Sequence, residues 1–255
     1  MKPTPRMHII TGKGGVGKTF VAQALVKKLT QNPNLEPVYV AASFEHKVKV
    51  DVPHIDLTPL KSAELYLERI FKSKMIAGWI TGTRFFQALF NVLPAMSYLI
   101  FLGHLIDKLE KNPKLHIVLD SPSTGHALTL FRSIDYFLEI FKTGHLTDDL
   151  KKMSEFINGD KIETWILSLP EPLPITEAIE LTEKLSPLPC KLVLNNCLMP
   201  VLDGEDKIPE VFKYKLDLER KIEREYKNKI NLALPHVSDR EGLHALADFL
   251  PEVIQ

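Results

Sequence analysis

The segment from Gly12 to Thr19 has the residue types and spacing best suited to chemistry in this sequence. It consists of Gly-Lys-Gly-Gly-Val-Gly-Lys-Thr and matches the pattern G-x-x-x-x-G-K-[ST] at every fixed position. Glycines allow the backbone of such a loop to turn its N–H groups inward on a phosphate. An apolar run precedes the loop and an amphipathic helical pattern follows it. The segment predicts a site for nucleotide phosphates, with a glycine-rich turn that binds nothing as the alternative.

Each part of this loop has an expected role. The ammonium group of Lys18 is predicted to reach the β- and γ-phosphates, and the hydroxyl group of Thr19 to bind Mg²⁺. The N-terminus of the following helix adds positive potential at the same place. The predicted nucleotide contacts in and beside the loop are Gly12, Gly14, Gly15, Val16, Gly17, Lys18, Thr19 and Phe20.

A carboxylate farther along the chain is suited to hold the same magnesium ion. The apolar run Leu115–Asp120 ends in Asp120. A strand beside the loop would bring this carboxylate to the Mg²⁺, through a water molecule. The predicted metal site therefore consists of Thr19 and Asp120, with ATP or ADP and Mg²⁺ as the ligands. The alternative is an ordinary aspartate at the end of a strand.

The elements that must position these residues follow from the hydrophobic pattern. Short apolar runs alternate with helical patterns, and several runs are apolar on both parities, as in a sheet covered by helices on both faces. This order predicts an α/β fold, that of a P-loop NTPase, with a mostly parallel sheet flanked by helices. The predicted strands are Met7–Thr11, Val38–Ala42, Leu115–Asp120, Glu163–Leu169, Lys191–Asn195 and Lys229–Leu234. The predicted helices are Thr19–Leu29, Lys61–Phe71, Thr124–Phe141, Thr147–Asn158, Ile175–Leu185, Pro209–Lys227 and Arg240–Leu250.

One long connection interrupts this alternation. The residues from Ser43 to Lys114 separate the second and third predicted strands and far exceed the length that a single crossover needs. Their pattern predicts several helices, and we place a helical insertion subdomain at about residues 61–112. The whole chain, residues 1–255, is predicted to form a single ATPase domain.

The composition excludes several classes of protein. The 255 residues include 32 Lys and Arg and 32 Asp and Glu, and this balance does not support a basic nucleic-acid-binding protein. Residues 85–106 contain no charged side chain, but Gln87, Asn91 and Pro94 interrupt them, so we expect no integral membrane span. The two cysteines suit the reducing environment of the cytoplasm, where we expect the protein to act.

A second lysine, Lys13, follows the first glycine of the loop. It has no part in holding the loop's own phosphate and could instead meet the phosphate of a facing subunit. In this respect the loop resembles the deviant Walker A family of ATPases, in which the extra lysine reaches across a dimer that sandwiches the nucleotides. The alternative is a solvated surface lysine.

The stretch after Asp120 narrows the resemblance. Residues 121–128 are Ser-Pro-Ser-Thr-Gly-His-Ala-Leu. They are similar to the Asp-Thr-Ala-Pro-Thr-Gly-His stretch of the ArsA-type ATPases, which drive arsenite pumps or target tail-anchored proteins. The resemblance implies that this stretch is the second switch, with Gly125 as its flexible point and His126 as a switch residue. A capping or core role for His126 remains open.

Other segments resemble the same family. Leu169-Pro170-Glu171 with the downstream Glu177, and the late apolar strand that ends in Asn195, are similar to its patterns. The resemblance implies that the Asn195 amide, which can both donate and accept, reads the adenine base. A turn-forming role for Asn195 is the alternative. The resemblance covers residues 7–200 and continues weakly to residue 250, and it is closest to a compact ArsA-related branch with one ATPase domain.

The sequence departs from the family at the first switch. Where the family has Asp-Pro-Ala-His, this chain has Ser-Phe-Glu-His, so Ser43 replaces the aspartate that positions the attacking water and His46 retains the histidine. A serine hydroxyl cannot act as a carboxylate base, although Glu45 could approach the water if the loop is shifted. Slow hydrolysis, or none, is therefore an open alternative. Ser43 and His46 are the predicted first-switch residues, and the predicted catalytic residues are Lys13, Lys18 and Glu45.

The cysteines are a second departure, because the targeting ATPases bind zinc through a Cys-x-x-Cys pair. Here Cys190 and Cys197 flank one predicted strand, which would hold them roughly 20 Å apart. This separation excludes a shared metal or a disulfide within the strand. We interpret both as small buried hydrophobic residues.

These observations predict a Mg²⁺-dependent ATPase that works as a nucleotide-gated dimer, either with an identical chain or with a related ATPase subunit. The alternative is a nucleotide-binding switch with little or no hydrolysis. Residues 79–105 carry more apolar side chains than one helix face can bury. They could form a closed helical core, an apolar surface for a hydrophobic protein client, or a dimer surface.

Overall fold

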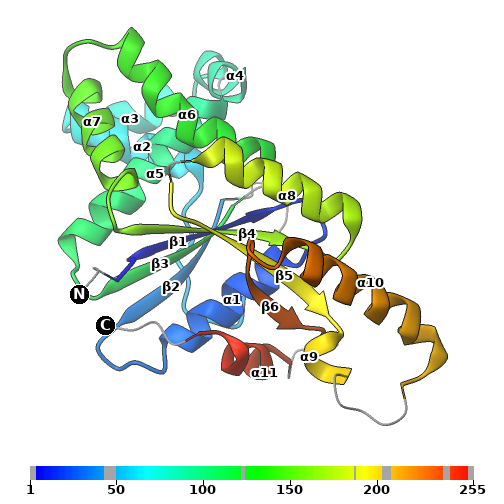
Figure 1. The fold of residues 1–255 in the computed structure, drawn as a ribbon. Helices are drawn as coiled ribbons and strands as arrows, with labels where there is room; N and C mark the ends of the chain where they lie inside the picture. Colours follow the sequence, from blue (N-terminus) through cyan, green and yellow to red (C-terminus); the bar gives the residue numbers. More distant parts are fainter. Residues whose placement is uncertain are drawn as a thin grey trace.

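A parallel β-sheet of six strands organises the chain (Figure 1). The computed structural model describes residues 4–42, 50–92, 94–121, 124–186, 188–202, 208–237 and 242–251. The strand order is β2-β3-β1-β4-β5-β6, and all five neighbouring pairs run parallel. The prediction of a parallel α/β fold is confirmed. The strands are β1 Met7–Gly12, β2 Glu36–Ala41, β3 Leu115–Asp120, β4 Ile162–Ser168, β5 Cys190–Cys197 and β6 Ile230–Pro235.

Helices cover both faces of this sheet. On one face α1 packs with α11, and on the other face α5 (Pro94–Lys111), α6 and α8 lie against the strands, with α7 outside α5 and α6 (Figure 1). Two apolar clusters, one on each face, form the core. The helices after the insertion are α6 Thr124–Ile140, α7 His145–Ile157, α8 Pro172–Leu185, α9 Met199–Leu202, α10 Glu210–Tyr226 and α11 Gly242–Phe249, and α1 spans Lys18–Leu29.

The central strand β1 explains where the phosphate loop lies. All six residues of β1 are buried, and successive side chains point to opposite faces. Met7 and Ile9 belong to the cluster on the α5 side, whereas Ile10 belongs to the cluster on the α1 side. The loop therefore begins at the carboxyl edge of the sheet, between β3 and β4, which is where open parallel sheets bind ligands.

Between β2 and β3 the described residues form four helices, where a simple crossover needs one. They are α2 Pro59–Phe71, α3 Lys74–Thr81, α4 Arg84–Val92 and α5 Pro94–Lys111. Side-chain caps fix two of the starts: Thr58 accepts a hydrogen bond from the Lys61 amide, and Ser73 accepts one from the Ile76 amide. α5 is the crossover helix of the sheet, so the predicted insertion at about 61–112 includes an element of the core.

The apolar residues of this region divide between two environments. Phe101, Leu102 and Leu105 on α5 are buried against the sheet. Trp79 on α3 and Phe85 on α4 are instead 74% and 78% exposed. Neither a closed core nor a continuous surface accounts for the whole stretch, because these buried residues lie on α5, which packs against β3, whereas the exposed ones lie on α3 and α4.

Element boundaries differ from the predicted ones by a few residues at most. The largest difference is at α8, which begins at Pro172 rather than at Ile175. Proline is favoured in the first turn of a helix because its missing N–H has no helical partner there. In the described part of the chain, no helix is both long and apolar enough to cross a bilayer.

Candidate nucleotide-binding site

The loop after β1 has a backbone shape that requires glycine at two positions. Gly17 caps α1 with a φ of 88°, a left-handed conformation that side chains disfavour. A Cβ atom at Gly17 would also clash with the amide nitrogen of Asn195. Gly15 has a φ of 85°, and neither Gly14 nor Gly15 has a heavy atom within 4 Å of the place where its Cβ would stand. The exposed middle of the loop therefore has room for a phosphate.

Lys18 is the half-buried cation of this loop. Its Nζ donates to the carbonyl oxygens of Gly12 and Lys13, at 3.1 Å and 3.0 Å. Burial lowers the pKa of Lys18, and the charge of Asp120 partly opposes this shift. The ammonium group thus lies across the loop, where it would meet phosphate oxygens as the motif requires.

Thr19 and Asp120 are brought together as the sequence predicts. Thr19 is in the first turn of α1, and Asp120 ends β3, opposite Ile10 of β1. The Thr19 hydroxyl donates to Asp120 Oδ2 at 2.6 Å. Hydroxyl and carboxylate oxygens are ligands that Mg²⁺ accepts when phosphates and water complete its shell, so these residues fit the predicted ion.

A third residue, Tyr39 on β2, belongs to the same site and was not predicted. Its hydroxyl donates to Asp120 Oδ2 at 2.8 Å, and its side chain is almost fully buried on the α1 side of the sheet. The apolar run around Tyr39 suggests only a core aromatic residue. Once the strand order is known, a hydroxyl group on the strand next to Asp120 is the signal that could have identified Tyr39.

The electrostatics of Asp120 result from opposing contributions. Burial raises its pKa, and the hydrogen bonds from Thr19 and Tyr39, together with the charge of Lys18, lower it without cancelling the rise. Burial and the neighbouring carboxylate raise the pKa of Tyr39. The phenol therefore remains a hydrogen-bond donor that helps to keep Asp120 ionised and oriented.

Replacing Tyr39 by phenylalanine is expected to weaken the response to Mg²⁺. A hydrogen bond to a charged group contributes about 1.5–3 kcal/mol, so the Mg²⁺ concentration for half-maximal ATP binding should rise about tenfold. The acid limb of any Mg²⁺-dependent activity should also move to higher pH, because a donor that lowers the pKa of Asp120 is lost. Titration of Mg²⁺ at several pH values measures both effects.

The exposed Tyr214 on α10 offers a matched control, since Tyr214→Phe makes the same chemical change away from the site. An unchanged Mg²⁺ requirement in Tyr39→Phe would show that its hydroxyl serves packing alone.

The other lysine of the loop, Lys13, is exposed and points to α8. Its Nζ forms an ion pair with Glu177 at 3.0 Å, and both side chains are about half exposed. Exposed ion pairs contribute little to stability. Lys13 can therefore be drawn away by a stronger anion at small cost.

Asn195, at the end of β5, contacts the loop directly. Its amide nitrogen donates to the Val16 carbonyl oxygen at 2.9 Å. This bond supports the loop and uses one of the two amide hydrogens, so the other N–H and the amide oxygen remain able to donate to and accept from a base. Phe20 is half-buried and packs against the cluster on the α1 side of the sheet.

The predicted switch residues, and the predicted catalytic residue Glu45, fall largely outside the described part of the chain. Ser43, Glu45 and His46 lie among residues 43–49, which are not described. The backbone of Gly125 and His126 is in the first turn of α6, and their side chains are not described. Their roles remain predictions.

The two cysteines lie at opposite ends of β5. Burial raises the pKa of Cys190 to about 11 and that of Cys197 to about 12, so both thiols are protonated at neutral pH. No group of three metal-binding side chains occurs among the residues that the structure describes.

Comparison with known proteins identifies a relative of this chain. The chain is 22% identical to the arsenical pump-driving ATPase of Acidiphilium multivorum over an alignment of 256 positions. The alignment covers 95% of this chain and 43% of that ATPase, so the chain spans less than half of its length. No model of a known protein family matches the chain.

Proposed function

We propose that this chain is a Mg²⁺-dependent ATPase related to the arsenical pump ATPases. The observation that carries the proposal is the contact between Thr19 and Asp120, 2.6 Å long, at the mouth of the Gly12–Thr19 loop. It joins the two parts of the sequence that a P-loop needs to hold Mg²⁺ beside a phosphate. The similarity over 95% of the chain to a protein named as an ATPase supports the same conclusion.

Different residues of this chain would bind the phosphates, bind the magnesium ion and position these groups. The loop amides and Lys18 would hold and neutralise the β- and γ-phosphates, while Thr19 and Asp120 would hold the magnesium ion. The bound ion would supply charge neutralisation at the phosphates. Tyr39 and Asn195 would keep the carboxylate and the loop in place through the bonds that they already make.

Release of phosphate from ATP tests the proposal. The purified chain should release phosphate only when Mg²⁺ is present, and Lys18→Ala should not. If the parent protein binds neither ATP nor ADP with Mg²⁺, the proposed function is wrong.

A second candidate is a nucleotide-dependent switch with little turnover. The observation in its favour is Ser43, which stands where related ATPases have an aspartate. In that case the protein binds ATP with Mg²⁺ but releases phosphate very slowly. Ser43→Asp should then raise the rate of phosphate release, by roughly 10²–10⁴-fold for a catalytic carboxylate.

We further propose that ATP assembles a dimer, with an identical chain or a related subunit, in which Lys13 contacts the nucleotide of the facing subunit. Lys13 is exposed, and its pair with Glu177 is of the weak, solvated kind. A facing phosphate would be a stronger partner for the ammonium group than a half-exposed carboxylate.

Lys13→Ala is expected to retain ADP binding and to lose the ATP-dependent dimer. Sedimentation with and without a non-hydrolysed ATP analogue measures the change. Glu177→Gln is the matched control, because it releases Lys13 without removing it, and it should dimerise at least as well as the parent. An unchanged dimer in Lys13→Ala would refute the cross-subunit role.

The exposed apolar side chains at the end of α2 and on α3 and α4 suit a hydrophobic protein client, which we propose as the cargo of the switch. They are Ile70, Phe71, Met75, Ile76, Trp79 and Phe85. Exposed apolar patches of this kind commonly mark binding surfaces.

ATP is expected to change the fluorescence of Trp79, because the chain passes from the predicted first switch into α2 and α3. Emission should differ between the ATP-analogue and ADP states. Trp79→Phe provides the background from Trp165, which is buried in β4. Identical Trp79 emission in all nucleotide states would remove the support for a nucleotide-gated client surface.

A further inference from the structure

A cavity in the helical region lies away from the phosphate loop. It has a volume of about 510 Å³ and is bounded by α2, α5, α6 and α7. None of the predicted nucleotide-binding residues lines it. Its volume is within the range of about 300–1,000 Å³ that small-molecule sites occupy.

The inner wall of the cavity is apolar. It includes Leu99 and Ile100 on α5, Phe137 on α6, and Leu150 and Met153 on α7. Leu99, Leu150 and Met153 are buried, and the other two are partly exposed. An aliphatic chain that packs against such a wall is removed from water, which is favourable.

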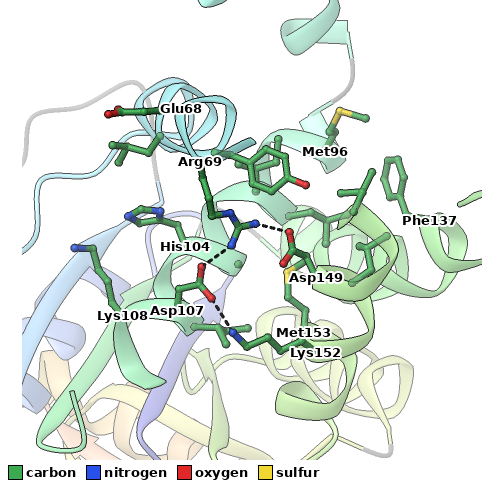
Figure 2. A pocket seen from close by; sticks show the side chains of 18 of the residues that line it. Glu68, Arg69, Met96, His104, Asp107, Lys108, Phe137, Asp149, Lys152 and Met153 are labelled. Atoms are coloured by element: carbon green, nitrogen blue, oxygen red, sulfur yellow. Dashed lines mark hydrogen bonds and ion pairs between the residues drawn. The ribbon is translucent and has the colours of Figure 1, made fainter. Parts of the chain in front are cut away.

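Charged side chains line the cavity beside this wall, and most of them neutralise one another (Figure 2). Arg69 on α2 pairs with Asp107 on α5 at 3.2 Å and with Asp149 on α7. Lys152 on α7 pairs with Asp107 at 2.9 Å and with Glu110 on α5 at 2.5 Å. These pairs link the three helices, and two cations are shared by three carboxylates, so the cluster carries one net negative charge.

Two lining lysines stand outside this cluster. Lys108 and Lys111 line it, and neither has an ion-pair partner among the described residues. Glu68 is a lining carboxylate that likewise lacks such a partner, so the unpaired lining groups leave one positive charge in excess. The half-buried His104 is a neighbour of both lysines: burial lowers its pKa most, and the charges of Lys108 and Lys111 lower it further.

One lining hydroxyl group is buried beside the ion pairs. The Tyr66 hydroxyl interacts with the Asp149 carboxylate and the Arg69 guanidinium, and the Arg69 guanidinium also lies over the Tyr66 ring. Burial and the charge of Asp149 raise the pKa of Tyr66, so this hydroxyl remains protonated. Tyr66 therefore belongs to the paired cluster, apart from Lys108 and Lys111.

We propose that this cavity binds an amphiphile that has one aliphatic chain and an anionic head group, of the kind found in long-chain carboxylates. The chain lies along the wall that contains Ile100 and Met153. The head group is neutralised by Lys108 and Lys111. This site does not depend on nucleotide binding.

Calorimetric titration of the full chain with laurate, below the concentration at which laurate forms micelles, tests the site. We expect one molecule to bind. Dodecyltrimethylammonium has a chain of similar length and a cationic head, and it should bind at least about tenfold more weakly. Absence of laurate binding, or equal binding of the two detergents, would overturn the proposal.

Variants locate the binding. Ile100→Trp and, independently, Leu146→Trp fill the cavity from α5 and from α7, and each should abolish laurate binding while the protein still unfolds cooperatively. The double variant Lys108→Glu with Lys111→Glu should weaken laurate by at least about tenfold. Lys114→Glu reverses a nearby exposed charge outside the cavity and should have no effect. Unchanged binding in both cavity-filling variants places the laurate elsewhere and overturns the proposal.

An anionic membrane lipid has an aliphatic chain and an anionic head group, as a free fatty acid does. Vesicles of phosphatidylglycerol distinguish the two sources. Vesicle binding that laurate competes away and that Ile100→Trp abolishes supports a lipid chain in the cavity. Laurate binding without vesicle binding supports the free acid. Vesicle binding that Ile100→Trp leaves intact, in a protein that does not bind laurate, overturns the proposal.

Lys18→Ala should bind laurate normally. A failure of the ATPase proposal can therefore be distinguished from a failure of the cavity proposal.

Discussion

The Lys18→Ala variant is expected to bind ATP with Mg²⁺ about 10- to 100-fold more weakly than the parent protein. Each charge-assisted hydrogen bond contributes about 1.5–3 kcal/mol, and about 1.4 kcal/mol corresponds to a factor of ten. In the structure the Lys18 ammonium group already lies across the loop, bonded to two of its carbonyl oxygens. It needs little rearrangement to reach phosphates, so its removal should cost close to the full contribution.

Equilibrium binding of a fluorescent ATP analogue measures this change. Lys28→Ala, at the other end of α1, is the matched control because it removes the same cation from the same helix. Its affinity should equal that of the parent. If Lys18→Ala binds the analogue as tightly as Lys28→Ala does, the assignment of the loop as a phosphate site is wrong.

The Asp120→Asn variant is expected to lose activity and to gain stability. Removing the carboxylate takes away a charge that would hold Mg²⁺, and metal-ion catalysis contributes several kcal/mol, so phosphate release should fall at least about 100-fold. The amide oxygen can still accept hydrogen bonds from Thr19 and Tyr39, which both donate to the native carboxylate. The buried charge disappears, and without nucleotide the melting temperature should rise.

The pH dependence of this stability has a definite sign. Burial is the largest influence on the pKa of Asp120 and raises it above the ordinary value of 3.8. The folded protein therefore keeps the proton to a higher pH than the unfolded chain does. As pH rises through this interval the parent loses stability relative to Asp120→Asn, and the difference is complete above the folded-state pKa.

Thermal unfolding from acid to neutral pH, in the absence of Mg²⁺ and nucleotide, measures this difference. Asp217→Asn changes a carboxylate that is 75% exposed on α10 and should show no such trend. A melting temperature of Asp120→Asn that falls below that of the parent at neutral pH would contradict the prediction, since it would mean that the ionised form is the stabilising one.

If both variants behave as expected, the loop and the carboxylate act as one magnesium–phosphate site. The proposed dimer and the proposed hydrophobic client then involve different parts of the molecule. Glu177 relates to the dimer because it pairs with Lys13, and the exposed residues of α3, which contacts α2 and α4, relate to the client. Variants at these two places can therefore be combined without disturbing a shared contact.

The features that the sequence determines by itself are local in character. The spacing of Gly12, Gly17 and Lys18 specifies a loop whose backbone and cation are neighbours along the chain. The runs that are apolar on both parities specify buried parallel strands, and the six strands lie within a few residues of the predicted ones. Asp120 could be placed near Thr19 because the carboxyl ends of parallel strands share one edge of the sheet.

Only the tertiary structure decides which distant side chains meet at that edge. Tyr39 and Asp120 are 81 positions apart, Lys13 and Glu177 are 164 apart, and Asn195 and Val16 are 179 apart. Each pairing depends on strand order and on the exact packing of a helix, which no local pattern encodes. The cavity between α2 and α7 arises in the same way, because its shape is what remains when four helices pack by their own side chains.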